Sequence, residues 1–87
     1  MEISAELSLY PLGAEELGGP IRTFAQKMED HGVELSTGFM SSTAVGTLDR
    51  VFEALKEAFA AVAEEHPCVL VAKFSNACPV EPKRQSP

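Results

Sequence analysis

A row of chemically capable side chains alternates with apolar ones near the start of the chain. Glu6, Ser8 and Tyr10 are separated by Leu7 and Leu9, and in a β-strand this spacing places the three polar side chains on one face. A carboxylate, a hydroxyl and a phenol in a row could bind a polar small molecule or, through the carboxylate, assist proton transfer. A solvated sheet face or a wet subunit interface would show the same pattern, and the residues alone leave these alternatives open.

A second hydroxyl-rich stretch supplies neighbours for this row. Ser41, Ser42 and Thr43 are consecutive within an expected strand over residues 39–46. Side chains alternate between the faces of a strand, so these three cannot all point the same way, and the pattern does not decide which of them join Glu6. Together the two stretches predict a polar patch with an aromatic wall.

Other residue types suited to catalysis or metal binding are sparse. His31 and His66 belong to no Ser-His-Asp or Cys-His arrangement visible in the sequence, and we interpret both as surface or capping residues. A zinc site built from His66, Cys68 and Cys78 is disfavoured because the spacing of the two cysteines does not match common zinc ligand sets. The sequence therefore predicts no catalytic group, no metal site and no cofactor.

Composition and charge indicate which classes of binding partner the chain can have. The 87 residues carry 7 Lys and Arg against 13 Asp and Glu, a net charge of −6, whereas nucleic-acid binding requires clustered basic residues. No apolar run approaches the ~20 residues that span a bilayer, and the first residues lack the basic and apolar regions of a signal peptide. The 2 cysteines make no disulfide framework. We expect a soluble, cytoplasmic protein that binds no nucleic acid and inserts into no membrane.

Changes in hydrophobic period divide the chain into six expected elements. The first strand carries apolar Ile3, Ala5 and Leu7 on the face opposite its polar row. Pro20 suits the first position of a helix, and Gly32 suits the left-handed position after its end. The expected strands cover residues 2–11, 33–37, 39–46 and 68–75, and the expected helices cover about 20–31 and 48–66.

The second helix has the clearest pattern of the six. Thr47 is the expected N-cap, Asp49 lies near the positive end of the helix dipole, and Pro67 ends the helix. Phe52 and Phe59 are expected in the core, where each would contribute roughly 2–3 kcal/mol. The expected apolar stripe comprises Leu48, Val51, Phe52, Leu55, Phe59 and Val62.

The order of the elements predicts an α+β fold of the ferredoxin-like βαββαβ type. Right-handed crossovers place four antiparallel strands in one sheet, with the first and third strands central and both helices on one face. A ligand or a second subunit must then use the uncovered face, and a homodimer is expected because so small a core gains from association. We expect a single domain over residues 1–79 and a disordered tail over residues 80–87.

Three short segments carry a resemblance to a known family. They are Ser-Leu-Tyr-Pro at residues 8–11, Val-Phe-Glu-Ala at residues 51–54, and Phe-Ser-x-x-Cys-Pro at residues 74–79. In this order and at these spacings, the chain resembles the YkoF family over roughly residues 4–79. YkoF-type proteins look like two ferredoxin-like domains in tandem, each with a binding site. This chain has one such domain, so the resemblance implies that two copies associate.

The resemblance implies non-enzymatic binding of thiamine or its hydroxymethylpyrimidine moiety, in thiamine salvage or transport. An aminopyrimidine would pair with hydroxyls and an Asn amide, and its flat face would stack on Tyr10 or Phe39. The cationic thiazolium of thiamine would be attracted by Glu6 or Glu34 and by an aromatic face. The expected ligand contacts are Ser8, Tyr10, Ser41, Thr43 and Ser75, followed by Glu6, Ser42 and Asn76.

Two other classes of function remain open at this point. The chain could be a structural or regulatory interaction module whose uncovered sheet face is used for dimerisation. It could also be a small ferredoxin-like enzyme, for which a titratable group inside the pocket is needed and Glu6 is the candidate. A cavity near Tyr10 and Ser41 would favour ligand binding, whereas a packed interface there would favour the interaction module.

Overall fold

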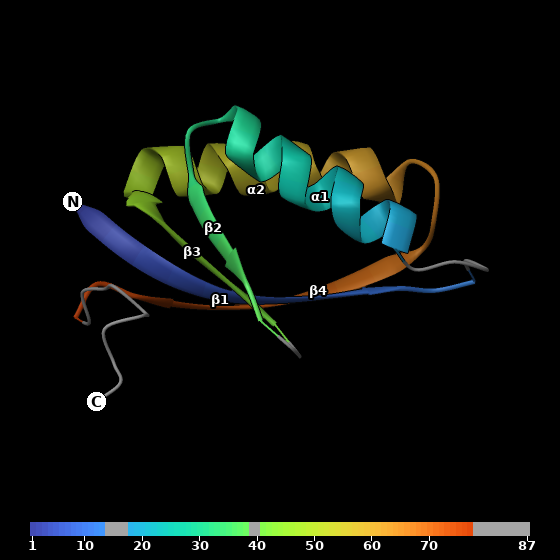
Figure 1. Cartoon of the computed structure of the whole chain (residues 1–87), viewed down its shortest axis with the longest axis horizontal. Helices are drawn as coiled ribbons and strands as arrows, with labels where there is room; N and C mark the ends of the chain where they lie inside the picture. The colour runs from blue at the N-terminus through green and yellow to red at the C-terminus, as the bar shows by residue number, and fades with distance from the viewer. Residues whose placement is uncertain (14–17, 39–40, 78–87) are drawn as a thin grey trace.

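The computed structural model describes residues 1–13, 18–38 and 41–77. Its elements are β1 (Glu2–Pro11), α1 (Gly18–Asp30), β2 (Glu34–Thr37), β3 (Ser42–Thr47), α2 (Leu48–Ala63) and β4 (Cys68–Ser75). The strands form one antiparallel sheet in the order β2-β3-β1-β4, and both helices lie on the same side of it (Figure 1). The predicted ferredoxin-like α+β fold, with the first and third strands central, is confirmed. Phe39, Cys78 and the expected tail over residues 80–87 lie outside the described residues.

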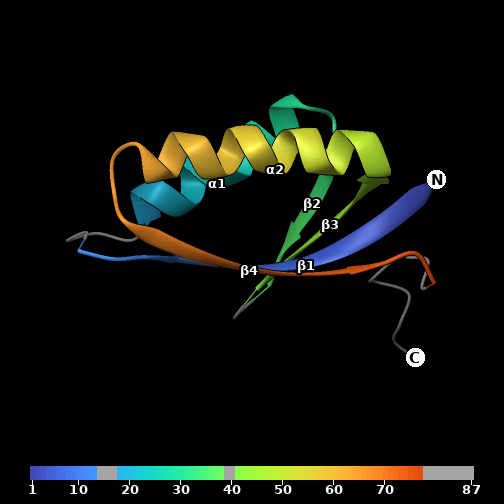
Figure 2. The same ribbon diagram turned by 180° about the vertical axis from the view of Figure 1, so that it is seen from behind.

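The register of the strands sorts the side chains of β1 onto two faces. Ala5 lies opposite Phe74 of β4, and residues directly opposite each other in an antiparallel pair share a face. This face is the one beneath the helices. Glu6 lies opposite Thr43 of β3 and Lys73 of β4 on the other face, which neither helix covers (Figures 1 and 2). The apolar side chains that alternate along β1 therefore point into the core, and the polar side chains between them point to the uncovered face.

One apolar core lies between the helices and the sheet. α1 contributes Phe24 and Met28, while α2 contributes the small Ala54 and Ala58, whose short side chains permit close packing. The core thus draws on both helices and on the strands beneath them. The buried residues are Ile3, Ala5, Leu7, Phe24, Met28, Val33, Ala44, Val51, Ala54, Leu55, Ala58 and Val62.

The prediction that Phe52 and Phe59 are core residues is wrong. Their side chains are 47% and 37% exposed, because the buried stripe of α2 runs through Val51 and Leu55 and leaves the two aromatic residues on its flank. Phe52 instead stacks on Phe74 of β4, with ring centroids 4.7 Å apart and planes 23° apart. The full-burial contribution of roughly 2–3 kcal/mol is therefore too large for either residue.

Several element boundaries differ from the sequence prediction, among them the start of α1 and both ends of β3. α1 begins at Gly18, ahead of Pro20, because backbone N–H groups of a first turn need no intrahelical partner and glycine is tolerated there. β3 begins at Ser42 and ends at Thr47. Thr47 is also the N-cap of α2, as predicted, and its Oγ1 accepts a hydrogen bond from the Arg50 N–H at 3.3 Å.

A Schellman motif ends α1. The Gly32 N–H donates to the Glu29 carbonyl at 2.9 Å, and the Val33 N–H donates to the Met28 carbonyl at 3.3 Å. The φ angle of Gly32 is 76°, in the left-handed region that favours glycine. Val33 and Met28 are both buried. These bonds hold the backbone of His31, which lies between the last helical residue and Gly32.

Candidate functional site

β1 runs past the start of β3, and among the described residues this overhang leaves a gap in the sheet. The last pair between these two strands is Leu7 with Ser42, whereas β4 continues to pair with β1 as far as Pro11. Figure 1 shows β2 and β3 crossing β1 at a steep angle. Among the described residues, the backbone edge of Ser8 and Leu9 on the β3 side therefore has no strand partner, and backbone polar groups at a buried edge require one.

A cavity of about 120 Å³ lies at this gap, between α1 and the sheet. Its apolar walls are Leu7 and Leu9 of β1, Phe24 and Ala25 of α1, and Leu35 of β2. Four of the lining residues carry hydroxyl groups, and an apolar hollow with a few polar groups is the usual form of a small-molecule site. The other described lining residues are Ser8, Ile21, Thr37, Gly38, Ser41 and Ser42.

Ser41 links the wall of this cavity to a carboxylate. Its Oγ donates a hydrogen bond to Glu6 Oε2 at 3.3 Å, while Glu6 Oε1 lies 3.8 Å from Lys73 Nζ. The side chains of Glu6 and Lys73 are 54% and 78% exposed, so this ion pair contributes only about 0–1 kcal/mol. The structure thus brings the predicted residues Glu6 and Ser41 together and leaves the carboxylate accessible.

The alternation of β3 separates the three consecutive hydroxyls. Ser42 lies opposite Leu7 and lines the cavity on the helix-covered side. Thr43 lies opposite Glu6 on the uncovered face. Ser41, which precedes the strand, lines the cavity and bonds Glu6. The sequence pattern left open which of these hydroxyls lie beside Glu6, and the strand register decides this. All three predicted contacts lie around one corner of the sheet.

The remaining predicted contacts lie away from the cavity. Tyr10 is 52% exposed and lies opposite Val69, outside the described lining. Val69 and Ser75 are six positions apart on β4, about 20 Å at ~3.3 Å per residue, so one small ligand cannot contact both Tyr10 and Ser75. Asn76 follows Ser75 directly, and the Ser75 Oγ accepts a hydrogen bond from the Ala77 N–H at 3.0 Å.

Sequence reasoning missed the apolar half of the cavity. Leu9, Ala25 and Leu35 have the spacing of ordinary core residues, and nothing in their types marks them as ligand contacts. The signal that could have found them is a mismatch in length, since β1 has 10 residues and β3 has 6. A central strand that outruns its neighbour leaves unpaired backbone beside the core. The true start of β3 had to be known before this mismatch could be seen.

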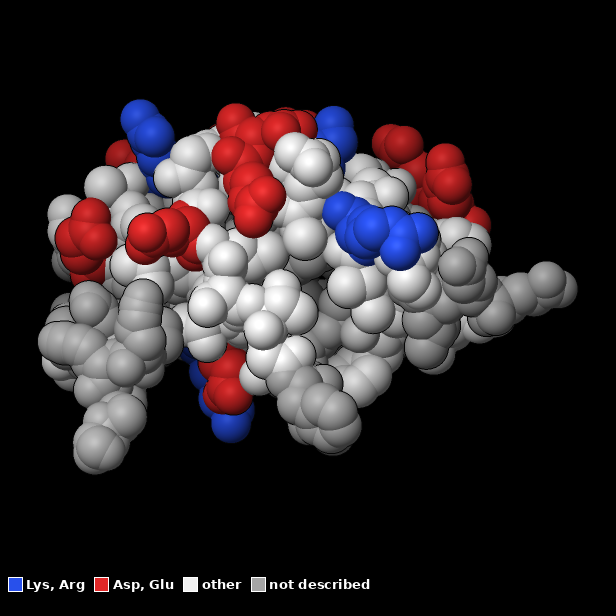
Figure 3. Space-filling view, in the orientation of Figure 1, with Lys and Arg blue, Asp and Glu red and all other residues white. Residues whose placement is uncertain are grey.

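Charged side chains are absent from the described lining of the cavity. None of its described lining residues is Lys, Arg, His, Asp or Glu. Figure 3 shows Lys and Arg in separate places on this side of the molecule and Asp and Glu gathered mainly over the helices. The cavity therefore suits a neutral, flat, apolar-edged group better than an anion. Within the described chain, neither helix has the length and apolar character required to cross a membrane.

A second hollow, of about 270 Å³, lies where the first turn of α1 meets the end of α2. Gly19, Pro20 and Thr23 line it from α1, and Glu65 and His66 line it from the segment after α2. None of its described lining residues belongs to a strand, and none of them is a ligand contact predicted from the sequence. The cavity beside β1 is therefore the stronger candidate for a ligand site.

Solved structures from three organisms share this fold. Hypothetical protein MJ1052 from Methanocaldococcus jannascii is 23% identical, with a TM-score of 0.80 over 92% of this chain and 84% of that chain. The domain of unknown function DUF77 from Bacillus cereus is 17% identical, with a TM-score of 0.79 over 98% and 86% of the two chains. TM0486 from Thermotoga maritima, provisionally assigned to thiamine biosynthesis/salvage, is 17% identical, with a TM-score of 0.80 over 95% of each chain.

These identities show a common fold and leave function open. The comparison with curated proteins found no match. The family comparison is more specific, because residues 2–81 of this chain match the YKOF-related Family. The match spans all six elements of the fold. The chain therefore belongs to the YKOF-related family.

Proposed function

We propose that this chain binds the pyrimidine part of thiamine, as free hydroxymethylpyrimidine or within thiamine, without transforming it. The role would be capture or delivery in thiamine salvage or transport, in the cytoplasm, with the domain over residues 1–79 as the binding unit. Membership of the YKOF-related family and the likeness to TM0486 give a thiamine-related role its support. The observation that carries the proposal is the ring-sized cavity beside the unpaired edge of β1.

The size of the cavity suits one ring. Its volume of about 120 Å³ is close to that of cavities of about 150 Å³ that hold a single benzene, and well below the ~300 Å³ at which sites for drug-sized ligands begin. The pyrimidine of thiamine would fill it. The thiazolium would then lie outside, so free hydroxymethylpyrimidine and thiamine would share one set of contacts.

The polar groups at the cavity match the edge of an aminopyrimidine. Its ring nitrogens accept hydrogen bonds and its exocyclic amine donates them, while the hydroxyls of Ser41 and Ser42 can do either. The backbone edge of Ser8 and Leu9 adds N–H and C=O groups that have no strand partner among the described residues. Phe24 lines the cavity from α1 and offers an aromatic surface to a flat ring.

Glu6 would attract the cationic thiazolium half of thiamine. Its carboxylate accepts the hydrogen bond from Ser41, so it stands next to the cavity wall, where a thiazolium leaving the cavity could reach it. Lys73 offsets part of its charge. The attraction should therefore be modest and weakened by salt, because exposed charges are screened within ~8 Å at physiological ionic strength.

Tyr10, Thr43, Ser75 and Asn76 stay predictions as ligand contacts. They belong to the uncovered face or its margin and are not among the described residues that line the cavity. Ser8 also belongs to the uncovered face, but it lines the cavity together with Ser41 and Ser42. We place the pyrimidine in the cavity. Tyr10 could contact a ligand only if that ligand also extended onto the uncovered face. Variants on the two sides of the sheet can separate these locations.

Calorimetric titration tests the proposal directly. Hydroxymethylpyrimidine and thiamine should both bind saturably, whereas the hydroxyethylthiazole half alone should give no saturable heat. Binding of the thiazole half but not of hydroxymethylpyrimidine would contradict the assignment of the cavity. An absence of heat with all three at millimolar concentration, for a protein shown by circular dichroism to be folded, would exclude the function.

Self-association through the uncovered sheet face is the second candidate. Val69 and Val71 on β4 and Tyr10 on β1 are 48%, 47% and 52% exposed, and their register places them side by side on that face. β4 is also an edge strand. An exposed apolar patch at the edge of an uncovered sheet is a typical contact surface for a second copy of the chain. Sedimentation equilibrium should then show a homodimer, and a monomer at 100 μM would remove this candidate.

A further inference from the structure

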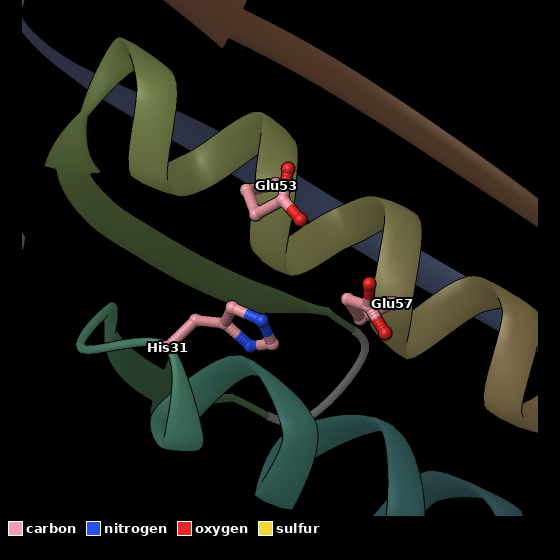
Figure 4. Close-up of side chains that lie close together, drawn as sticks. All are labelled: His31, Glu53 and Glu57. Carbon is pink, nitrogen blue, oxygen red and sulfur yellow. The ribbon is translucent and has the colours of Figure 1, made fainter.

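We propose that His31, Glu53 and Glu57 form a binding site for a divalent transition-metal ion, with Zn²⁺ as the reference ion. The site lies on the side of the molecule formed by the two helices, apart from the cavity beside β1, and it does not depend on thiamine binding. His31 follows the end of α1, while Glu53 and Glu57 belong to α2. Figure 4 shows the His31 ring between the two helices and both carboxylates on α2.

The three ligand atoms, one from each side chain, all lie within 4.8 Å of one another. Tetrahedral Zn²⁺, with bonds of about 2.0–2.1 Å to nitrogen and oxygen, needs its ligand atoms about 3.3 Å apart. Glu53 is exposed and Glu57 is half-buried, so small rotations of these side chains could close the difference. Glu53 and Glu57 are four positions apart, a spacing that places both side chains on one face of a helix.

A hydrogen bond outside the cluster fixes the tautomer of neutral His31. Its Nδ1 lies 3.0 Å from the Lys27 carbonyl oxygen. A carbonyl only accepts, so Nδ1 must carry the proton and Nε2 keeps its lone pair. Histidines that bind metals usually donate their other ring N–H to a carbonyl or carboxylate in this way. The Schellman motif described above holds the backbone of the same residue, so the ring is oriented before an ion arrives.

The surroundings favour a cation over an internal ion pair. His31 makes no ion pair with either carboxylate among the described residues, and the carbonyl end of the α1 dipole attracts positive charge. Lys56 competes for Glu53, with Nζ 3.8 Å from Glu53 Oε2, but both side chains are more than half exposed (70% and 52%). Such a pair is worth only about 0–1 kcal/mol, so an ion held by three ligands would displace it.

The donor set points to the class of ion. Ca²⁺ and Mg²⁺ prefer oxygen ligands alone, whereas one imidazole and two carboxylates suit Zn²⁺ and its neighbours in the first transition row. Three protein ligands would leave one position of a tetrahedral ion to water. The ion would tie the end of α1 to the middle of α2, so its binding should also stabilise the fold.

Titration of the full chain, free of any histidine tag, with ZnCl₂ tests the site. We expect one ion per chain, a rise in melting temperature at saturation, and at least a tenfold loss of affinity in both His31→Ala and Glu53→Gln/Glu57→Gln. His66→Ala is the matched control, because this second histidine lies outside the cluster. Cys68→Ser/Cys78→Ser removes the thiols as alternative ligands. Both controls should bind as the parent protein does.

Three results would overturn the site. The first is an absence of saturable binding at 1 mM Zn²⁺. The second is retention of parental affinity in folded His31→Ala or in folded Glu53→Gln/Glu57→Gln. The third is loss of affinity in the cysteine double variant or in His66→Ala, which would assign the ion to other ligands. Far-ultraviolet circular dichroism of each variant establishes that it is folded before its affinity is compared.

Discussion

The hydroxyl of Ser41 donates a hydrogen bond of 3.3 Å to the carboxylate of Glu6, 35 positions earlier in the chain. Glu6 belongs to the uncovered face of the sheet, whereas Ser41 also lines the cavity beneath α1. The bond therefore joins the uncovered face, where the sequence predicted the ligand, to the cavity on the helix-covered side. It passes around the corner where β3 begins and β1 continues beyond it, which is where we place the pyrimidine.

Filling the cavity should abolish binding without harming the fold. Ala25 lines the cavity from α1, and Ala25→Leu would place a larger side chain in the space proposed for the ring. Alanine and leucine are both strong helix formers, so α1 should keep its stability. We expect at least a tenfold loss of hydroxymethylpyrimidine affinity by calorimetry, with an unchanged circular dichroism spectrum.

The exposed Ala60 of α2 provides the control for this change. Ala60→Leu makes the same substitution away from the cavity and should leave the affinity as it is. Equal affinity in Ala25→Leu and the parent protein would show that the ligand does not occupy this cavity.

Variants on the two sides of the sheet should differ in their effect on affinity. Ser41→Ala removes a cavity hydroxyl and should weaken hydroxymethylpyrimidine binding by roughly 0.5–1.5 kcal/mol, the usual net value of one hydrogen bond. Tyr10→Ala removes a side chain outside the described lining and should change the affinity little. A large loss in Tyr10→Ala with none in Ser41→Ala would move the site to the uncovered face.

A charge on the uncovered face should prevent self-association. Val71 is 47% exposed and lies opposite Ser8 on that face, so Val71→Lys would bury an unpaired charge in any interface formed there. Sedimentation equilibrium should show a shift towards monomer, while Ala60→Lys on α2 should leave the assembly unchanged. A dimer that survives Val71→Lys must use another surface.

Truncating Phe52 should cost less than truncating a buried side chain. Phe52→Ala loses a half-exposed ring and its stack on Phe74, and aromatic pairs add about 0.5–1.5 kcal/mol beyond the area they bury. Met28 is fully buried, so Met28→Ala should cost about 2–5 kcal/mol. Urea unfolding of both variants measures the difference. A larger loss in Phe52→Ala than in Met28→Ala would mean that the aromatic flank of α2 is covered in solution.

The double variant Phe52→Ala/Phe74→Ala isolates the stack itself. Its unfolding free energy, compared with those of the two single variants, should show a coupling of about 0.5–1.5 kcal/mol. Strict additivity of the two single losses would show that the stacked rings do not stabilise each other.

Gly19, in the first turn of α1, and Gly32, just after its end, should respond in opposite ways to alanine. Gly32 has a φ of 76°, and a Cβ there would meet Arg50 Nη1 at 2.6 Å. Because the Arg50 side chain can move, the backbone conformation dominates, and Gly32→Ala should destabilise by about 1–2 kcal/mol. A Cβ on Gly19 meets nothing within 4 Å, so Gly19→Ala should stabilise by roughly 0.4–1 kcal/mol. A lower denaturation midpoint for Gly19→Ala than for the parent protein would contradict this expectation, and so would an unchanged midpoint for Gly32→Ala.

Local periodicity was enough to determine the elements and the fold. The alternation of β1 and the helical spacing of α2 reflect which side chains are buried, because burial repeats with the period of the backbone. The turn glycine at Gly32 and the N-cap at Thr47 could also be predicted, since each satisfies backbone groups of its own helix end. For the site, the sequence identified Glu6 and Ser41 as residues of interest.

Tertiary structure alone decided how segments far apart in the chain meet. The register of β1 with β3 places Ser42 and Thr43 on opposite faces, and the cavity lies where β3 starts later than the sequence predicted. The roll of α2 puts Phe52 on its flank, and the packing of the two helices brings His31 to Glu53 and Glu57. The sequence contains no periodic pattern that predicts these contacts. Each contact depends on how two elements lie relative to each other, and not on which side chains of either element are buried.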